Sequence, residues 1–222
     1  MKNKRGQIWI LLGLLLITAA LAITGYNFWE DRQAEKNVSD AMMQLRVMVP
    51  EQMPAEEADT AVQTLPQDDR PALRQIPEEI PDYILNPRME MPKKAVNGYD
   101  YIGIVEIPAC SIELPIIANW SYPALKVAPC RFEGSVYTGD LILAGHDYKS
   151  HFRGLRDLAG GEKVIFTDMD GNVFSFTVTE TETISGSDME GLQAGTWDLT
   201  LFTCTADGAS RIVVRCETNT DV

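Results

Sequence analysis

Cys204 lies where a catalytic nucleophile would be expected in this chain. It ends an apolar, strand-like stretch, residues 197–203, and a polar loop, residues 205–210, follows it. The strand would fix the position of the thiol, and the loop would leave room for a substrate. Because a free thiol is mostly protonated at neutral pH, thiolate chemistry needs a neighbouring base or imidazolium. We therefore take Cys204 as the candidate nucleophile and expect a histidine beside it.

Two histidines could supply that group, His146 and His151. His146 closes the apolar stretch 141–145 and is expected at a strand end, as Cys204 is. His151 lies five residues further on in a polar stretch and is expected to be a surface loop residue. The sequence therefore favours His146 as the acid and base.

An acyl-transfer site also needs positive charge or hydrogen-bond donors where the oxyanion develops. Arg211 opens the strand after the Cys204 loop and would project toward the same end of the sheet if the two strands pair. Arg215, four residues later, should share its strand face and is the competing cation. Strand periodicity alone leaves both arginines open.

The composition argues against nucleic-acid and zinc binding. Nineteen Lys and Arg against 32 Asp and Glu give a net charge of −13, whereas binding to phosphate backbones needs clustered cations. The four cysteines form no CxxC pair and are accompanied by two histidines, so the usual zinc ligand sets cannot be assembled and we expect no metal site. A disulfide between Cys110 and Cys130 is left open by the sequence, and Cys216 is expected to pack within a strand.

An N-terminal hydrophobic segment precedes all of these residues. Residues 8–24 carry no charge, and three cations, Lys2, Lys4 and Arg5, come before them. A helix of roughly 20 such residues crosses the hydrocarbon core of a bilayer. A cleavable signal peptide shares this pattern, but an aromatic cluster suited to the membrane interface follows at 26–29. The sequence favours an uncleaved single-pass anchor with its N-terminus in the cytoplasm, and everything beyond residue 30 is expected outside the cell.

Residues 31–98 are expected to link this anchor to a folded domain. Apolar residues recur at three- and four-residue steps between positions 38 and 49, which predicts an amphipathic helix ending near Pro50. Residues 50–92 hold eight of the 12 prolines and predict an extended acidic stalk. The chain thus divides into a cytoplasmic tip with anchor at 1–30, a helix and stalk at 31–98, and a catalytic domain at 99–222.

The pattern of the domain at 99–222 is mainly β. Short apolar runs are broken by Gly, Pro and Asp, which is typical of strands joined by tight turns. Many short strands favour a closed or nearly closed barrel of about eight strands with short helices. The predicted strands are residues 101–107, 112–117, 141–144, 163–167, 173–178, 197–203 and 211–217, and the helical pieces are residues 122–127 and 152–158.

Several motifs of this domain together resemble the sortase family of cysteine transpeptidases. They are Thr-Leu-Phe-Thr-Cys at 200–204, the arginine at 211 and Ala-Gly-His at 144–146. The resemblance covers roughly residues 99–217, and the order of the motifs along the chain makes it specific. It implies a sortase-like barrel behind an N-terminal transmembrane helix.

The resemblance also implies which residues form the site. His146, Cys204 and Arg211 would be catalytic, because the family spacing favours this arginine over the one that follows it. Thr203 would help to orient the backbone of a bound peptide, and Ala144 would contact the substrate as part of the same motifs. No cofactor is implied for the reaction itself.

The implied reaction acts on a secreted protein that carries a sorting signal similar to Leu-Pro-x-Thr-Gly. Cys204 would attack the Thr carbonyl carbon to form a thioester, and His146 would protonate the departing Gly amine. An incoming amine, from a peptidoglycan precursor or a pilin lysine, would then resolve the thioester with His146 as base. The site would lie at the outer face of a Gram-positive-type cell membrane.

The sub-class of sortase stays open. Pro-Asp-Tyr at 81–83 partly resembles the lid motif of pilus-polymerising sortases, whereas the short stretch 147–152 is closer to general or housekeeping types. The stretch 183–195 is expected to be a mobile loop that reads the substrate. Its Asp188 and Glu190 could host calcium, as in some relatives, although acidic loop residues are more often solvated.

Two other functional classes remain open from the sequence. One is an extracellular cysteine endopeptidase, whose product would not change when amines are added. The other is a non-catalytic, membrane-tethered binding barrel, whose activity would survive replacement of Cys204 by Ala.

Overall fold

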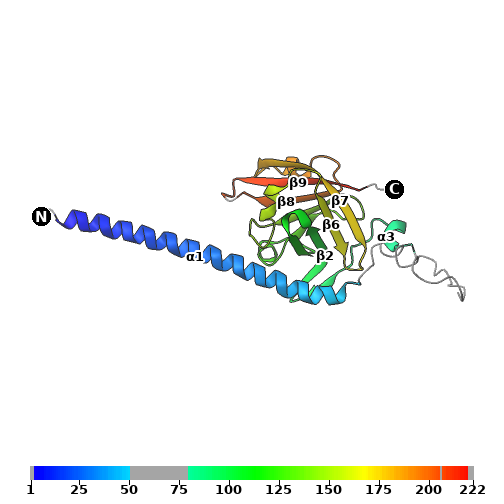
Figure 1. Cartoon of the computed structure of the whole chain (residues 1–222), viewed down its shortest axis with the longest axis horizontal. Coiled ribbons are helices and arrows are strands. Elements are labelled where there is room, and N and C mark those ends of the chain that lie inside the picture. The colour runs from blue at the N-terminus through cyan, green and yellow to red at the C-terminus, as the bar shows by residue number, and fades with distance from the viewer. Residues whose placement is uncertain (1–2, 51–79, 206, 220–222) are drawn as a thin grey trace, which may run out of the picture.

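The chain folds into one long helix and a β-barrel that packs beside the C-terminal half of that helix (Figure 1). The computed structural model describes residues 3–50, 80–205 and 207–219. Helix α1 (Asn3–Met48) runs without a break through position 30, where the sequence suggested a boundary. Its N-terminal half extends away from the barrel (Figure 1).

The N-terminal part of α1 is long and apolar enough to cross a membrane. Its most apolar 18-residue window has a mean hydropathy of 2.4, and none of that window is buried against the rest of the chain. Further along, α1 turns an apolar face to the barrel, where Val38, Ala41, Met42 and Leu45 are buried. The amphipathic face predicted from the residue spacing is therefore confirmed. Most of the predicted stalk falls on residues 51–79, which lie outside the described residues.

Nine strands of the described residues form one sheet in the order β1-β2-β3-β4-β5-β8-β9-β7-β6. Because β6 also pairs with β2, the eight strands β2 to β9 close into a barrel, and β1 is an extra strand on β2. The closed barrel of about eight strands is therefore confirmed. The strands are β1 (Lys94–Val96), β2 (Tyr99–Ile107), β3 (Ile112–Ile117), β4 (Cys130–Glu133), β5 (Leu141–Gly145), β6 (Lys163–Asp168), β7 (Val173–Ser185), β8 (Leu199–Cys204) and β9 (Ser210–Thr218).

The structure differs from the prediction made from the sequence at two strands. Strand β7 continues to Ser185 and pairs with β9 from Phe176 to Ser185, whereas the sequence predicted a loop from position 183. Thr and Glu alternate between positions 179 and 183, so no apolar residue marks this half of the strand. Strand β4 was not predicted, because it has four residues, two of them charged, and one register pair with β3.

Within the part of the chain that the structure describes, five short helices connect or flank the strands. The predicted helical pieces at 122–127 and 152–158 correspond to α4 and η2, and α5 lies within the predicted loop 183–195. The helices are α3 (Asp82–Leu85), η1 (Pro108–Cys110), α4 (Tyr122–Leu125), η2 (Arg153–Asp157) and α5 (Met189–Gln193).

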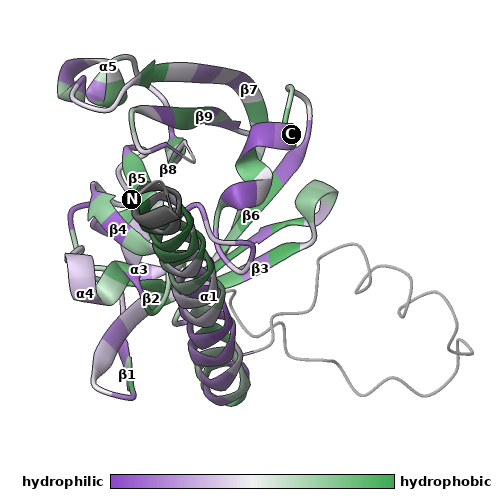
Figure 2. Cartoon of the chain, turned by 90° about the vertical axis from the view of Figure 1, so that its left-hand side faces the viewer, coloured by the Kyte–Doolittle hydropathy of each residue, from purple (hydrophilic) through white to green (hydrophobic). Residues whose placement is uncertain are grey.

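The interior of the barrel is filled by apolar side chains from all of its strands. Gly103 of β2 allows the closing pair with β6, because a Cβ at this position would overlap the ring of Phe166 and the carbonyl oxygen of Thr167. Figure 2 looks along α1 from its N-terminal end, with the strands of the barrel beyond it. The closed sheet fixes where each strand ends, and strand ends carry the candidate site.

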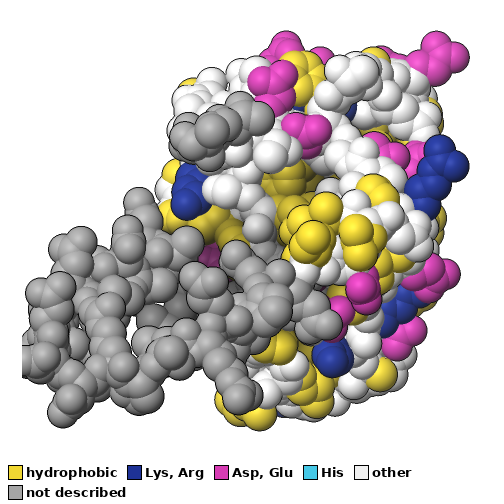
Figure 3. Space-filling model, turned by 90° about the vertical axis from the view of Figure 1, so that its right-hand side faces the viewer, with side chains coloured by type: hydrophobic (Ala, Val, Ile, Leu, Met, Phe, Trp, Pro, Cys, Tyr) yellow, Lys and Arg dark blue, Asp and Glu magenta, His cyan; other side chains and the backbone are white. Residues whose placement is uncertain are grey.

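Helix α3 covers the end of the barrel where β5 and β7 begin. Its Tyr83 stacks on Tyr137, with ring centroids 4.8 Å apart, and meets Phe174 at 5.2 Å. Tyr137 precedes β5, and Phe174 lies at the start of β7. Figure 3 shows the face of the molecule away from the N-terminus, where hydrophobic side chains gather and acidic side chains lie around them.

Candidate active site

Three adjacent strands bring the predicted catalytic residues to one end of the barrel. Strands β5 and β8 are parallel neighbours with Gly145 opposite Thr203, so His146 and Cys204 follow at the same edge. Strands β8 and β9 are antiparallel, and Cys204 is the register partner of Arg211. The structure therefore places all three at the ends of β5, β8 and β9.

Cys204 and His146 line one groove of about 650 Å³. Its walls are formed by α1 between positions 24 and 31, by the stretch between positions 146 and 153, and by the loop between positions 204 and 208. We call this the Cys204 groove. The site therefore lies between the barrel and the long helix, immediately after the apolar part of that helix.

Cys204 is the exposed cysteine, and none of the four cysteines is in a disulfide. Burial raises the pKa of the Cys130 and Cys216 thiols to about 12. Burial also raises the pKa of Cys110, whose Sγ donates to the carbonyl oxygen of Gly154 at 3.2 Å. The disulfide that the sequence left open is not formed, and the packing role predicted for Cys216 is confirmed. Exposure thus distinguishes Cys204 from the other thiols.

His146 lies against an aromatic ring and has a buried nitrogen. Its ring stacks on Tyr148 with centroids 4.7 Å apart, and its Nε2 has no hydrogen-bond partner among the described residues. Burial lowers the pKa of His146; the charge of Lys126 lowers it further, and that of Glu30 opposes the shift. The neutral imidazole is therefore favoured at pH 7, and it can accept a proton.

The two arginines of β9 have different surroundings. Arg211 is half-buried, its guanidinium lies 5.8 Å from the centroid of the Phe202 ring, and its buried Nη1 has no partner among the described residues. Arg215 is 2% exposed and bonds to Glu182 at 2.8 Å and to the carbonyl oxygens of Gly191 and Leu192. Arg215 thus fixes α5 to the barrel, and Arg211 has donors left for a ligand.

The structure contradicts the expectation that His151 is a surface loop residue. His151 is 1% exposed and lies 5.3 Å from the Tyr148 ring, measured between centroids. The cause is a tight turn, in which the His151 N–H donates to the Tyr148 carbonyl and the Phe152 N–H donates to the His146 carbonyl. Burial, followed by the charge of His146, lowers the pKa of His151 to about 3. The local sequence is polar, but the turn directs the ring inward.

Thr203 and Ala144, which the resemblance assigns to substrate contacts, are buried in β8 and β5. Neither lines the Cys204 groove. The Thr203 hydroxyl has no hydrogen-bond partner among the described residues. Their contact with substrate stays a prediction.

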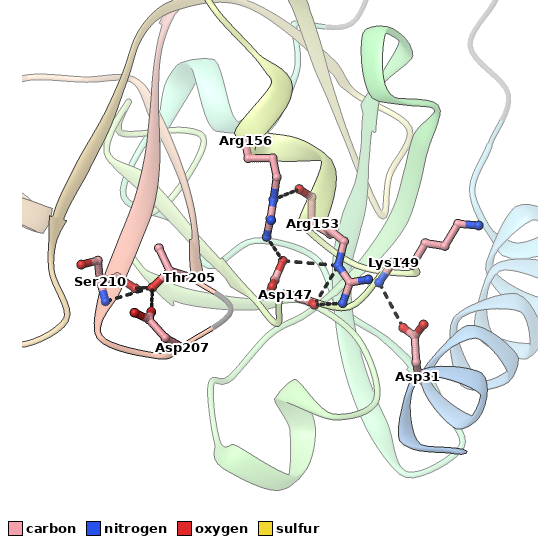
Figure 4. A network of polar contacts seen from close by, with 8 residues as sticks. All are labelled: Asp31, Asp147, Lys149, Arg153, Arg156, Thr205, Asp207 and Ser210. Carbon is pink, nitrogen blue, oxygen red and sulfur yellow. Dashed lines mark hydrogen bonds and ion pairs between the residues drawn. The ribbon is translucent and has the colours of Figure 1, made fainter. Parts of the chain in front are cut away.

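A polar network that the sequence did not reveal surrounds the groove (Figure 4). Asp147 lies between Arg153 and Arg156 and is ion-paired with both. On one side, Asp31 of α1 accepts a hydrogen bond from the backbone N–H of Lys149 at 3.0 Å. On the other side, the loop after Cys204 is closed by contacts among Thr205, Asp207 and Ser210. Among these contacts, the one between Asp31 and Lys149 joins residues 118 positions apart, so no local pattern indicates that α1 meets this loop.

Two further expectations concerned a lid and calcium. Residues 81–83 pack where β5 and β7 begin, and this is the opposite end of the barrel from Cys204, at the end of β8. They therefore do not cover the Cys204 groove. Asp188 caps α5 by accepting a hydrogen bond from the Gly191 N–H at 2.7 Å. Within the described residues no group of three or more His, Cys, Asp or Glu side chains is arranged to hold a metal ion.

A comparison with protein families matches residues 105–219 to the sortase domain. This match covers more than half of the chain and includes all three predicted catalytic residues. A comparison with curated proteins found no match.

Solved structures of sortases have a similar fold. A sortase D5 transpeptidase from Clostridium perfringens has 18% identity and a TM-score of 0.50, and the match covers 84% of this chain and 98% of that one. Sortase A from Listeria monocytogenes has 24% identity and a TM-score of 0.49, over 54% of this chain and 88% of that one. Sortase C from Streptococcus pneumoniae has 26% identity and a TM-score of 0.48, and the match covers 53% of this chain and 68% of that one.

Proposed function

The chain belongs to the sortase family, and from this premise we propose that it is a membrane-anchored cysteine transpeptidase that uses Cys204, His146 and Arg211. The observation that supports these roles best is the register of three neighbouring strands. It brings an exposed thiol opposite Arg211 and beside the strand that His146 directly follows.

In the proposed acylation step the Cys204 thiol transfers its proton to His146. The thiolate sulfur attacks the carbonyl carbon of the substrate threonine, and the oxyanion is stabilised by the guanidinium of Arg211. The bond from this carbon to the glycine nitrogen then breaks, and the His146 imidazolium protonates the leaving amine. A thioester on Cys204 and a free glycine amine result.

In the proposed second step an amine attacks the thioester. His146 takes a proton from the attacking nitrogen, the carbon–sulfur bond breaks, and the Cys204 thiolate is released and reprotonated. The low pKa of His146 supports its role as a base, because the neutral ring is available at pH 7. The product is the substrate protein joined to the acceptor through a new amide bond.

We propose that the substrate is a secreted protein with a Leu-Pro-x-Thr-Gly-like sorting signal. The acceptor would be an amine of a peptidoglycan precursor or of a pilin. Asp31 and Asp207 line the groove, and their negative charge favours the approach of a protonated amine. No cofactor takes part in the proposed steps, and calcium at Asp188 and Glu190 is not part of the proposal.

We further propose that α1 anchors the protein as a single pass in a Gram-positive-type cell membrane. The three cations before its apolar stretch support a cytoplasmic N-terminus, and the barrel would then lie outside the cell. Because the groove borders α1 just after the apolar stretch, the site would lie close to the outer membrane surface.

The test uses the full chain in lipid nanodiscs with a fluorogenic Leu-Pro-Glu-Thr-Gly peptide and triglycine as the amine. We expect cleavage that yields a peptide–triglycine product, and we expect the Cys204→Ala protein to give neither cleavage nor product. Cleavage with a hydrolysed product that amines do not alter would instead indicate an endopeptidase. An absence of cleavage over a panel of signal peptides would point to the binding barrel.

A further inference from the structure

Two acidic residues of α1 hold the strand end that carries His146. Asp31 accepts from the backbone N–H of Lys149 at 3.0 Å, and Glu30 accepts from the Tyr148 hydroxyl at 3.4 Å. Both contacts join residues 118 positions apart in the sequence. They attach the loop after His146 to the long helix, about two turns beyond its apolar stretch.

Glu30 is itself fixed in position. The Lys126 ammonium donates to Glu30 Oε1 at 2.7 Å, and the Tyr26 hydroxyl donates to the same oxygen at 2.9 Å. The Glu30 side chain is 19% exposed, and its contact with Lys126 lowers its pKa. The carboxylate is therefore charged at neutral pH and has its second oxygen directed to Tyr148.

Tyr148 lies between the two histidines of the chain. Its ring is 4.7 Å from that of His146, at an interplanar angle of 28°, and 5.3 Å from that of His151, at 48°. It is thus the aromatic partner against which the His146 imidazole rests, and the buried ring of His151 lies beside it. A displacement of Tyr148 would free the His146 ring to rotate.

We propose that Tyr148 is a positioning residue for His146 and that Glu30 of α1 holds Tyr148 in place, so that the helix completes the active site. The inference rests on the proposed role of His146 in catalysis. Tyr148 does not react in this account. It restrains the imidazole in the orientation that serves both Cys204 and the leaving amine, and a restrained base needs no reorganisation at the moment of proton transfer.

The charges near His146 give the proposal a test that a general loss of stability would not pass, because two substitutions should change the pKa of His146 in opposite directions. Lys126 lowers the pKa of His146 and Glu30 raises it, and His151 is the other titratable group against Tyr148. Replacing Glu30 by Gln keeps an acceptor oxygen but removes the charge, so it should lower the pKa of His146. Replacing Tyr148 by Ala removes cover from the ring, so it should raise that pKa toward its usual value.

The experiment compares full-length Tyr148→Ala, Tyr148→Phe and Glu30→Gln in nanodiscs. Arg46→Gln is the matched control, because it breaks an ion pair between α1 and Glu113 of β3 that lies away from the groove. We expect Tyr148→Ala to lower kcat roughly tenfold at unchanged KM, a fraction of what general acid–base catalysis supplies. Tyr148→Phe and Glu30→Gln should lower kcat by a factor of about 3, and Arg46→Gln should leave it unchanged.

The second readout is an NMR titration of the His146 ring, which needs no substrate. We expect opposite pKa shifts for Tyr148→Ala and Glu30→Gln. Unchanged kcat and unchanged titration in both would overturn the proposal, as would a higher kcat, since the helix would then obstruct the site. If Tyr148→Ala fails to fold, Tyr148→Phe and Glu30→Gln decide the question. If the wild type has no activity on any peptide, the proposed function fails, and the titration still tests the positioning.

Discussion

Cys204 and Arg211 are register partners across β8 and β9, and residues 205–210 lie between them in the sequence. In an antiparallel pair such partners lie directly opposite each other. The two side chains therefore start from facing positions on the same side of the sheet, and this placement is set by the strand pairing and does not depend on the loop. Within a single extended strand, two residues seven positions apart would lie more than about 20 Å from each other and could not face the same substrate.

Mutation of Arg211 should lower activity, whereas mutation of Arg215 should lower the stability of the fold. Arg211→Ala removes the donor proposed for the oxyanion, so kcat/KM should fall roughly 10²–10³-fold with little change in the free energy of unfolding. Arg215→Met leaves Glu182 and two carbonyl oxygens unpaired and should lower that free energy by at least about 2 kcal/mol. Peptide cleavage and urea denaturation measure the two quantities. Normal activity in Arg211→Ala would contradict the assignment.

Thiol labelling should be confined to one position in the folded protein. Cys204 is exposed, whereas burial raises the pKa of Cys110, Cys130 and Cys216. We therefore expect iodoacetamide at pH 7.5 to alkylate Cys204 and to leave the other three intact. Mass spectrometry of tryptic peptides identifies the site, and labelling in urea provides the control. Modification of Cys130 at a similar rate would show that the barrel opens.

His151 should make the barrel sensitive to acid. Its folded pKa of about 3 lies below the usual value of 6.5, so folding favours the neutral ring. The contribution of the neutral His151 ring to the free energy of unfolding is fully present above pH 6.5. It is lost as the pH falls toward 3, by up to about 1.4 kcal/mol per pH unit. His151→Phe cannot take up this proton, so its free energy of unfolding should fall less between pH 7 and pH 4.5 than that of the wild type. Equal losses in both proteins, measured by urea denaturation, would refute this.

Gly145 should not tolerate a side chain. A Cβ at this position would overlap the buried ring of Phe152, and His146 is the next residue. We expect Gly145→Ala to lower the free energy of unfolding by about 1–3 kcal/mol and to reduce cleavage activity as well. Gly25→Ala is the control, because nothing lies within 4 Å of a Cβ there. A variant with wild-type stability would show that Phe152 can move aside.

The sequence predicts the barrel well wherever apolar residues mark the strands. Residues 101–107 and 112–117, for example, correspond to β2 and β3. It fails where a strand lacks that pattern, as in the Thr–Glu half of β7, because pairing with β9 and not burial maintains that part. Strand β4 escapes notice for a similar reason, since it is short and charged.

In the candidate site, too, the residues marked by a local sequence pattern were predicted and those placed by tertiary contacts were not. His146 and Cys204 could be singled out because each stands at the boundary of an apolar strand, whereas the choice of Arg211 over Arg215 rested on the resemblance to the family. Strand order then brings all three to one edge. Tyr148 and Glu30 could not, because their contact arises when α1 packs against the barrel. His151 was misjudged because its neighbours are polar, although the turn around it directs the ring inward.

Helix α1 runs unbroken from its apolar stretch to the barrel, which it holds at Glu30, at Asp31 and at Arg46. Tilting is one way in which a transmembrane helix adapts to bilayer thickness. If α1 spans a membrane as proposed, any such tilt would be passed on to the barrel as a lean of the whole domain, because the helix has no break between its apolar stretch and the barrel. Lipid composition could in this way change how far the reactive sulfur stands from the bilayer and at what angle it meets an arriving polypeptide.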